Sequence, residues 1–469
     1  MRNVMVQDRI KRERARFIES LDKAAILKLA SSYHKNAPCK FFKPLKHGGF
    51  NVCFFVEFDL PGCNAKKPRW VVRIPIPGRN PVAWIDEKLE VEVATMRHVA
   101  LNTKIPVPKV HAYSFSGQSP IGMAFIIMDF VDGQNLREHG FKQGDKWNNW
   151  RGPTEATKLV YQQLAEVLIE LRKQEFPAIG ALGIDPCGPS KSNLAGVRVC
   201  HRPLSIEIAM QESEGQNPSE MFPARKTFST ASEYIQSLLW LLDNELNRCS
   251  NPDIDRAADR GKMLLYAARD FRRFVTQKWL DASKENGPFV LMHGVLHNHY
   301  SNLLWDEDLK LVGVIDWEWS HVVPVQLFTP PVWLDNATVE SVCLFQGLFK
   351  DELGYLHQEI SNAEAARGEP HTLSIEWEMM QTWSHSLVVS SLFRPNDMYD
   401  VYWDFMSQDI FKTDAHQDKS EVQVKAVLAW VAGSETAQAW LKEKAIIQDK
   451  YYEQVDKYKL LEDIKDKTK

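Results

Sequence analysis

The chain lacks the features that mark secreted, membrane-spanning and nucleic-acid-binding proteins. Its seven cysteines are an odd number without a Cys-x-x-Cys pair, so we expect reduced thiols and a cytoplasmic location. The first residues are charged and contain no apolar segment, so no signal peptide is expected, and no apolar run approaches membrane-spanning length. The net charge of −4 gives no reason to expect nucleic acid as a partner.

The chain has 469 residues and contains no internal repeat. This length fits two lobes better than one domain. Hydrophobic residues make up 44% and charged residues 25% of the chain. These values are ordinary for a globular protein. Composition therefore sets a size and a class, and any specific chemistry has to come from local patterns.

The most informative pattern lies in residues 289–320, where short apolar runs alternate with polar loops. We predict strands at 289–292, 302–305 and 311–315, with a turn at the acids of 306–308. Two of these strands bring Asn302 and Asp316 to neighbouring loops. An amide oxygen and a carboxylate side by side suit a hard divalent cation, which usually also holds phosphates. We predict that Asn302 and Asp316 bind a metal ion.

The N-terminal third reads as one helix followed by β-structure. We predict a helix over 1–30 and a hairpin at Gly48-Gly49, between two apolar runs. The strand at 70–75 carries the single cation Arg73, and residues 86–101 have helical spacing with Glu92 near their middle. An apolar strand follows at 125–128.

The rest of the chain reads as mostly helical. Residues 184–226 are rich in Pro, Ser, Asn and charge, which is typical of a long connecting region. A capping-box signature at Thr230 to Glu233 opens one helix. The predicted helices span 154–173, 234–247, 256–280, 338–362 and 374–393, and 437–469 form a charged C-terminal helix.

His293-Gly294 and Ile315-Asp316-Trp317 resemble motifs of the aminoglycoside phosphotransferase and choline kinase family, in its fungal branch. The resemblance covers roughly residues 40–400 and rests on the combination of motifs. It implies an α+β, two-lobe, protein-kinase-like fold. The lobes would be a β-rich N-lobe at 31–131 and a helical C-lobe at 132–436, with a catalytic-like loop at 293–302 and a metal loop at 315–319.

The resemblance also implies ATP and Mg²⁺ as cofactors. Gly48 and Gly49 would form a flap over the phosphates, and the backbone around Met128 and Phe130 would be the hinge that binds adenine. Arg73 takes the place of the family's strand lysine, which contacts phosphates and pairs with a helix glutamate, here Glu92. The alternatives are a simple turn at the glycines, and a surface Arg73 with a solvated Glu92.

The catalytic loop departs from the family pattern, because Val295 stands where the catalytic aspartate is expected. Asn302 follows Val295 by seven positions rather than five. In a shifted register His297 occupies the base position, and imidazole is a competent base near neutral pH. Alternatively, His297 and His299 have no chemical role. With Val295 and His297, His293 belongs to the candidate catalytic set, and the family gives it the role of a loop organiser. Zinc binding by these histidines is disfavoured by the adjacent glycine and the absence of nearby cysteine.

The leading function is an ATP- and magnesium-dependent phosphotransferase that acts on a small-molecule hydroxyl or amine. One alternative is a catalytically impaired pseudokinase that binds nucleotide or a partner. Another is a cleft used for non-phosphoryl biosynthetic chemistry. Nucleotide and a small-molecule substrate are the expected partners, with neither nucleic acid nor membrane, while substrate identity and oligomeric state do not follow from the sequence.

Overall fold

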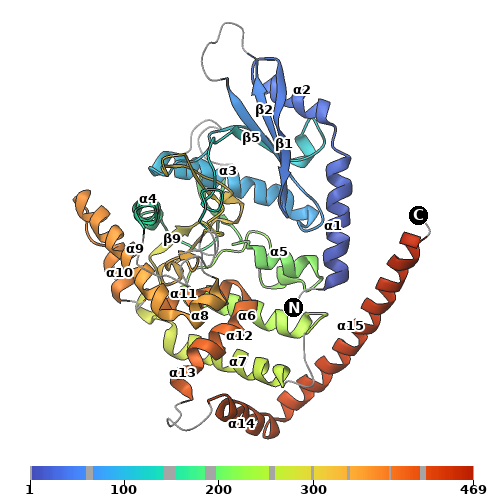
Figure 1. The fold of residues 1–469 in the computed structure, drawn as a ribbon, viewed down its shortest axis with the longest axis vertical. Helices are drawn as coiled ribbons and strands as arrows, with labels where there is room; N and C mark the ends of the chain where they lie inside the picture. The colour runs from blue at the N-terminus through green and yellow to red at the C-terminus, as the bar shows by residue number, and fades with distance from the viewer. Residues whose placement is uncertain are drawn as a thin grey trace.

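A computed structural model describes residues 3–59, 67–141, 154–184, 197–252, 259–296, 300–334, 338–379, 382–411 and 419–467. An antiparallel sheet forms the N-terminal part and a mostly helical part follows it, so the chain is α+β as expected (Figure 1).

The N-terminal segment contains two helices, so the prediction of one helix over 1–30 is wrong. Helix α1 spans Val4–Glu19 and α2 spans Lys23–Tyr33. The side chain of Asp22 accepts hydrogen bonds from the backbone N–H groups of Ala24 and Ala25. Aspartate at this position caps a new helix start instead of continuing the old helix, because its carboxylate satisfies the open N–H groups.

The main sheet has the strand order β1-β2-β3-β5-β4. Its strands are β1 (Cys39–His47), β2 (Asn51–Phe58), β3 (Arg69–Pro75), β4 (Val110–Ser114) and β5 (Phe125–Asp129). Side chains alternate between its two faces. Val72 and Ile74 pack in one core with α2, whereas Val71 and Met128 join the larger core of the helical part. The predicted hairpin at Gly48-Gly49 is the β1–β2 connection.

Helix α3 (Ile85–Asn102) packs between the sheet and the helical part (Figure 1). It buries the apolar side chains of Leu89, Val93 and Met96, and also the charged side chains of Lys88 and Glu92. Buried charges are costly unless they are paired. Their partners are residues of the candidate site.

The helical part contains short strands as well as helices. Its helices are α4 (Glu155–Arg172), α5 (Ile206–Ser213), α6 (Ala231–Arg248), α7 (Arg260–Phe274), α8 (Val339–Leu344), α9 (Gln346–Ala366), α10 (Leu373–Met379), α11 (Thr382–Phe393), α12 (Met398–Asp400), α13 (Ser407–Ile410), α14 (Lys419–Ala432) and α15 (Glu435–Lys467). The expectation of a plain connecting region over 184–226 is wrong. It holds strand β8 (Val197–His201), which pairs with β7 (Ala181–Ile184), and α5, whose N-terminus is capped by the Ser205 side chain.

The strands predicted in 289–320 are present. Strand β9 (Phe289–Met292) lies between β6 (Glu175–Phe176) and β12 (His321–Pro324). Strands β10 (Leu303–Trp305) and β11 (Leu311–Val314) form a hairpin. These two small sheets position the candidate site.

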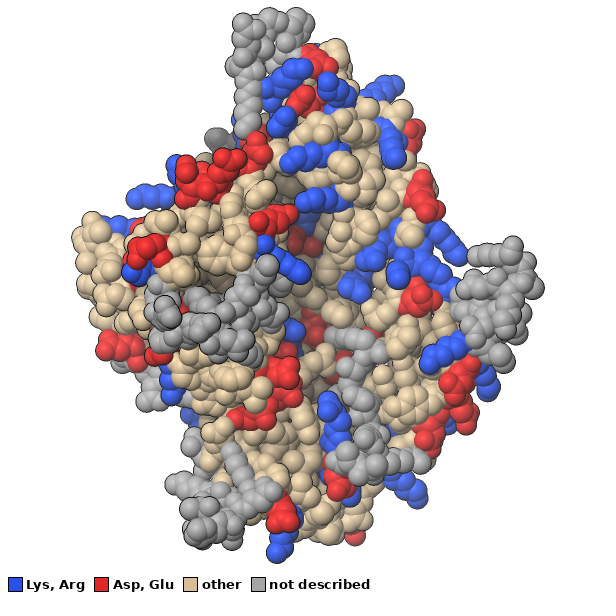
Figure 2. Space-filling model, viewed as in Figure 1, with Lys and Arg blue, Asp and Glu red and all other residues tan. Residues whose placement is uncertain are grey.

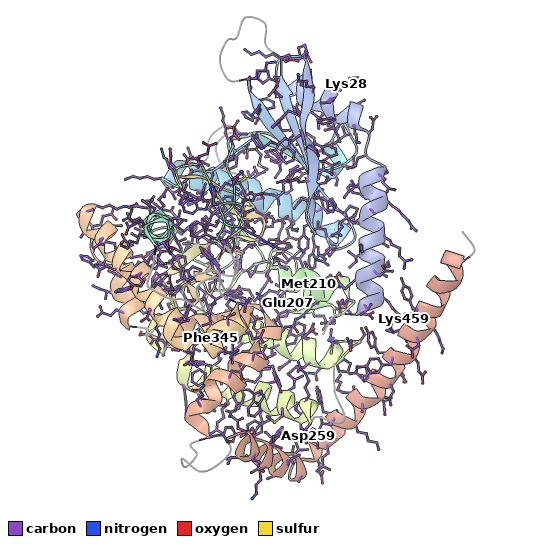
Figure 3. The ribbon with its side chains drawn as sticks, in the orientation of Figure 1. Lys28, Glu207, Met210, Asp259, Phe345 and Lys459 are labelled. Carbon is purple, nitrogen blue, oxygen red and sulfur yellow. The ribbon has the colours of Figure 1, made fainter. Side chains whose placement is uncertain are left out.

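The C-terminal helix α15 runs along one edge of the molecule, ending beyond Lys459 (Figure 3). The Tyr451 hydroxyl accepts from the Val4 N–H, and the Tyr458 hydroxyl donates to Asp8, so α15 is tied to α1.

Basic side chains gather over α1 on the visible face (Figure 2). None of the helices within the described residues is long and apolar enough to span a membrane.

Candidate functional site

The β10–β11 hairpin brings the two predicted metal ligands together. Asn302 precedes β10 and Asp316 follows β11, and the Asn302 amide nitrogen lies 3.4 Å from a carboxylate oxygen of Asp316. Asp316 has φ 68° and ψ 54°, in the left-handed region that few residues other than glycine adopt. Such backbone strain concentrates at functional positions. The predicted proximity is confirmed, whereas metal binding stays a prediction.

Arg73 connects this hairpin to the sheet. Its guanidinium pairs with Glu92 of α3, lies 2.5 Å from Asp316 Oδ1 and lies 3.5 Å from Glu318 Oε1. The Arg73 side chain is only 7% exposed. The predicted Arg73–Glu92 ion pair is therefore confirmed, and the surface alternative for Arg73 is wrong. Its contact with phosphate stays a prediction.

The carboxylates around Arg73 respond unequally to burial. Burial alone would raise the pKa of Asp316, but the charge and hydrogen bond of Arg73 outweigh it and hold that pKa below its usual value. Burial raises the pKa of Glu92 to about 8, because the attraction of Arg73 offsets only part of the desolvation and two other carboxylates lie nearby. Asp316 is thus the carboxylate that stays ionised over the wider pH range.

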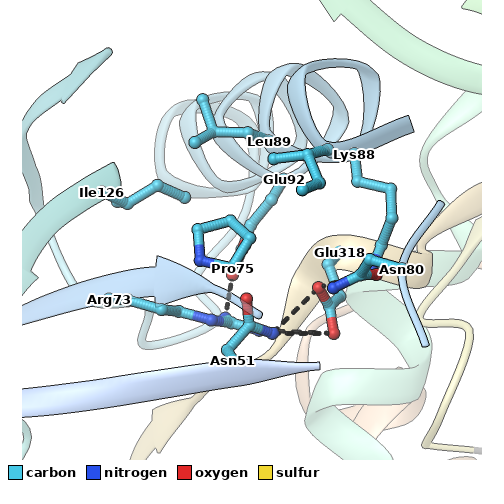
Figure 4. Close-up of a pocket in the computed structure, with 10 residues that line it drawn as sticks. Asn51, Arg73, Pro75, Asn80, Lys88, Leu89, Glu92, Ile126 and Glu318 are labelled. Atoms are coloured by element: carbon cyan, nitrogen blue, oxygen red, sulfur yellow. Dashed lines mark hydrogen bonds and ion pairs between the residues drawn. The ribbon is translucent and has the colours of Figure 1, made fainter. Parts of the chain in front are cut away.

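Four further polar residues complete the site, and sequence reasoning missed them (Figure 4). The Lys88 ammonium lies 3.1 Å from Glu318 Oε2 and 2.5 Å from Asn80 Oδ1. The Asn51 amide donates to both oxygens of Glu318, at 3.0 and 3.1 Å. Two signals were available in the sequence, since Lys88 precedes Glu92 by one helical turn and Glu318 follows Asp316 by two residues.

The donor chemistry of this set fits a magnesium ion. Asp316, Asn302 and Glu318 offer hard oxygen atoms, which Mg²⁺ prefers. Asp316 is the most accessible of the carboxylates, with its side chain 31% exposed against 5% for Glu318. Two cations, Arg73 and Lys88, face the carboxyl groups of this set. Within the described ranges, His, Cys, Asp and Glu form no group of three that suggests a metal centre.

His293 belongs to the candidate catalytic set, but its contacts favour a structural role. The ring is 1% exposed, and Nε2 lies 2.9 Å from the Ile315 carbonyl oxygen. Nδ1 accepts from the Val295 N–H at 3.4 Å. Burial lowers the pKa of His293, so the ring is neutral with its proton on Nε2. It fixes the loop to the residue before Asp316.

Gly294 allows the same loop to approach the metal loop closely. A Cβ atom added at Gly294 would lie 2.0 Å from the Trp319 carbonyl oxygen. Val295, next along, is partly buried against the main core and supplies no carboxylate. His297 and His299 lie outside the described residues, so the register of the loop stays a prediction.

The residues assigned to the flap lie in the β1–β2 connection, and those assigned to the hinge lie at the end of β5. An added Cβ at Gly48 would meet nothing within 4 Å, and at Gly49 it would meet only the Arg79 side chain, so packing does not require either glycine. Met128 is buried in β5 opposite Val71. The Phe130 N–H already donates to the Arg69 carbonyl at 2.9 Å, so adenine would need another backbone group here. Nucleotide contact by these four residues stays a prediction.

Replacing Gly294 with alanine should destabilise the fold by about 3 kcal/mol or more, because the new methyl group overlaps the Trp319 backbone. Urea unfolding measures the change. Gly347→Ala is the matched control, since an added Cβ there meets nothing within 4 Å and alanine favours helix α9. Equal stability of both variants would contradict the close approach.

His321, which follows the metal loop, should make stability fall in mild acid. Its Nε2 lies 2.9 Å from the Tyr234 hydroxyl and Nδ1 lies 3.0 Å from the Trp319 carbonyl, and burial lowers its pKa to about 4. The unfolded chain, with a pKa of about 6.5, binds the proton first, so the contribution is present above pH 6.5 and is lost as pH falls toward 4.

Between pH 7 and pH 5 this group should therefore cost the folded state about 2 kcal/mol. Unfolding of the wild type and of His321→Gln at the two pH values measures it. The glutamine side chain keeps hydrogen-bonding capacity but does not titrate. An identical pH dependence in both proteins would show that His321 is not the group responsible.

Comparison with known proteins identifies the family of the chain. The model of the phosphotransferase enzyme family matches residues 62–325, more than half of the chain. Clavilactone A biosynthesis cluster protein Y of Ampulloclitocybe clavipes is 28% identical over 254 residues, which cover 54% of each chain. A subtelomeric hrmA-associated cluster protein of Aspergillus fumigatus is 32% identical over 145 residues. That match covers 31% of this chain and 25% of the relative.

Other similarities are more distant. Altered inheritance of mitochondria protein 9 of Zygosaccharomyces rouxii is 32% identical over 114 residues, covering 24% of this chain and 18% of that protein. The chain thus spans about half or less of these relatives. Aminoglycoside phosphotransferase APH(4)-Ia aligns over 83% of this chain and 98% of its own, with a TM-score of 0.41 and 14% identity. On the family match, the chain belongs to the phosphotransferase enzyme family.

Proposed function

We propose that the chain binds ATP with Mg²⁺ and transfers a phosphoryl group to a hydroxyl or amine of a small molecule. The supporting observation is that one buried arginine, Arg73, contacts both Glu92 on α3 and Asp316 at the hairpin. Phosphoryl transfer depends on positioning and on neutralising phosphate charge more than on covalent work by the protein. A cation beside oxygen ligands for a metal meets that need.

Each residue then has a distinct part. Arg73 would contact phosphate oxygens, for which its planar guanidinium is suited, and Glu92 would hold it in place. Asp316 and Asn302 would hold the magnesium ion. When bound, the ion would neutralise phosphate charge. Gly48, Gly49, Met128 and Phe130 would line the nucleotide from the flap and the hinge, between an N-lobe at 31–131 and a C-lobe at 132–436.

The contact between Arg73 and Asp316 has a direct consequence for this proposal. Asp316 Oδ1 accepts from Arg73 at 2.5 Å, so the guanidinium competes with a metal ion for this carboxylate. Nucleotide and metal would therefore replace this contact, Arg73 turning to phosphate and Asp316 to the ion. Glu92 would remain with Arg73 throughout, because both side chains are buried and a buried charge without its partner is costly.

A second function is favoured by one observation, the valine at position 295. A nucleotide-binding pseudokinase needs the phosphate and metal residues but not a base. Non-phosphoryl chemistry in a biosynthetic pathway is the third possibility, and one relative bears the name of a biosynthesis cluster protein. The cytoplasmic location predicted from the cysteines is part of the proposal too, and the described cysteines Cys39, Cys53, Cys200, Cys249 and Cys343 are free thiols.

Replacing Asp316 with asparagine should weaken MgATP binding at least tenfold, since a metal ligand loses its charge, while the left-handed backbone tolerates asparagine. Titration calorimetry with ATP, with and without magnesium, measures both proteins. Asp306→Asn, in the turn of the same hairpin, is the control and should bind as the wild type does. Wild-type protein that fails to bind millimolar nucleotide would remove both the kinase and the pseudokinase functions.

The catalytic base is tested by His297→Ala and Val295→Asp. If His297 is the base, its loss should lower phosphoryl transfer about 10²- to 10⁴-fold with little change in nucleotide affinity. Wild-type transfer should then fall as pH drops through the histidine pKa, and Val295→Asp should restore little. ADP release with small alcohols and amines as acceptors measures transfer. Robust transfer that survives His297→Ala would eliminate the shifted register, and recovery by Val295→Asp of an inactive wild type would assign the base position to residue 295.

A further inference from the structure

The flap between β1 and β2 is attached to the metal loop by a largely buried cluster, which we call the flap clasp. It consists of Phe50, Asn51, Asn80, Lys88, Glu318 and Trp319. Phe50 and Asn51 belong to the flap, Asn80 to the loop after β3, Lys88 to α3, and Glu318 and Trp319 to the short helix Trp317–Trp319 after Asp316. Three separate segments of the N-terminal part thus meet one segment of the helical part.

Contacts within the clasp hold both the side chains and the backbone of the flap. The Asn51 amide donates to Glu318, and the Phe50 ring lies edge-on to Trp319 with centroids 4.9 Å apart. The Asn80 amide donates to the Phe50 carbonyl at 2.9 Å. These contacts hold the flap against the segment that follows Asp316.

Lys88 is the centre of the clasp. Its ammonium pairs with Glu318 and Asn80, and it lies 3.8 Å from the centroid of the Trp319 ring and 4.7 Å from that of Phe50. Lys88 is 4% exposed. Reaching toward a phosphate would break both polar bonds and two cation–π contacts, each of which is worth more when desolvated. Lys88 therefore acts on the flap and not directly on a ligand.

We propose that the flap clasp keeps the flap closed against the metal loop and limits the rate at which nucleotide enters and leaves, with Lys88 and Glu318 as positioning residues. The proposal rests on the proposed function for the identity of the nucleotide. Glu318, already bound to Lys88 and Asn51, leaves the metal ion to Asp316 and Asn302.

Hydrogen exchange of the ligand-free protein tests the clasp without nucleotide. The readout is the exchange rate of the flap amides at 48–51, where the Gly48 N–H donates to the Asn51 carbonyl. The proteins are wild type, Lys88→Met, Glu318→Gln and the double variant, which leaves no buried charge without its partner. Glu87→Gln is the control, because Glu87 neighbours Lys88 on α3 but pairs with Arg202, away from the flap.

We expect roughly ten- to hundredfold faster exchange of the flap amides in the three clasp variants, the factor given by loss of one hydrogen bond to a charged group. Exchange in Glu87→Gln should match the wild type at the flap. Unchanged flap exchange in the folded double variant would overturn the proposal.

Stopped-flow kinetics with a fluorescent ATP analogue and magnesium adds the functional readout. Association and dissociation should both become faster in the clasp variants, with a smaller change in affinity. Lost nucleotide binding in Lys88→Met with unchanged flap exchange would make Lys88 a phosphate ligand and overturn the proposal. A magnesium requirement that is lost in Glu318→Gln alone would make Glu318 a metal ligand and would also overturn it. If the wild type binds no nucleotide, the proposed function fails, while hydrogen exchange still decides the clasp.

Discussion

The arrangement of the candidate site depends on one buried cation that must be paired. Arg73 projects from the middle of the sheet into a region where its side chain is only 7% exposed, and it satisfies its charge with Glu92 and Asp316. A buried guanidinium without partners would cost the folded state several kcal/mol. This requirement fixes α3 beneath the sheet and brings the β10–β11 hairpin against it, so the N-terminal and helical parts meet at a defined position.

Lys88 is a second buried cation, and it too is paired with a carboxylate. It lies on α3 one helical turn before Glu92. Its partner Glu318 lies two residues after Asp316, so one short segment supplies a carboxylate to each cation. His293 and Gly294 contact the backbone of Ile315 and Trp319. The metal loop at 315–319 is therefore also held by the loop that begins at His293. The carboxylate of Asp316 remains the accessible group at the centre. These buried polar contacts together position Asp316.

Much of this could be predicted from the sequence where local pattern and tertiary contact agree. The strands around Asn302 and Asp316 were predictable because apolar runs bounded by acids and polar loops have few alternatives. The pair of Arg73 and Glu92 came from a family pattern. The helix break at Asp22 was missed because a single capping residue outweighs an apolar periodicity that continues through it. Strand β8 and helix α5 were missed because they are stabilised by packing on α3 and α6 and not by intrinsic propensity. Lys88 and Glu318 were missed because charged residues on a helix or in a turn ordinarily face water.

The proposed function requires that Arg73 and Asp316 form the site where phosphate and metal meet. Its most direct test is a crystal structure with magnesium and a non-hydrolysable ATP analogue. We expect Arg73 to keep Glu92 but to leave Asp316 for phosphate oxygens, and we expect Asp316 and Asn302 to contact the metal ion. A nucleotide bound in the cleft with the Arg73–Asp316 contact intact, or a cleft that excludes the nucleotide at saturating concentration, would contradict it.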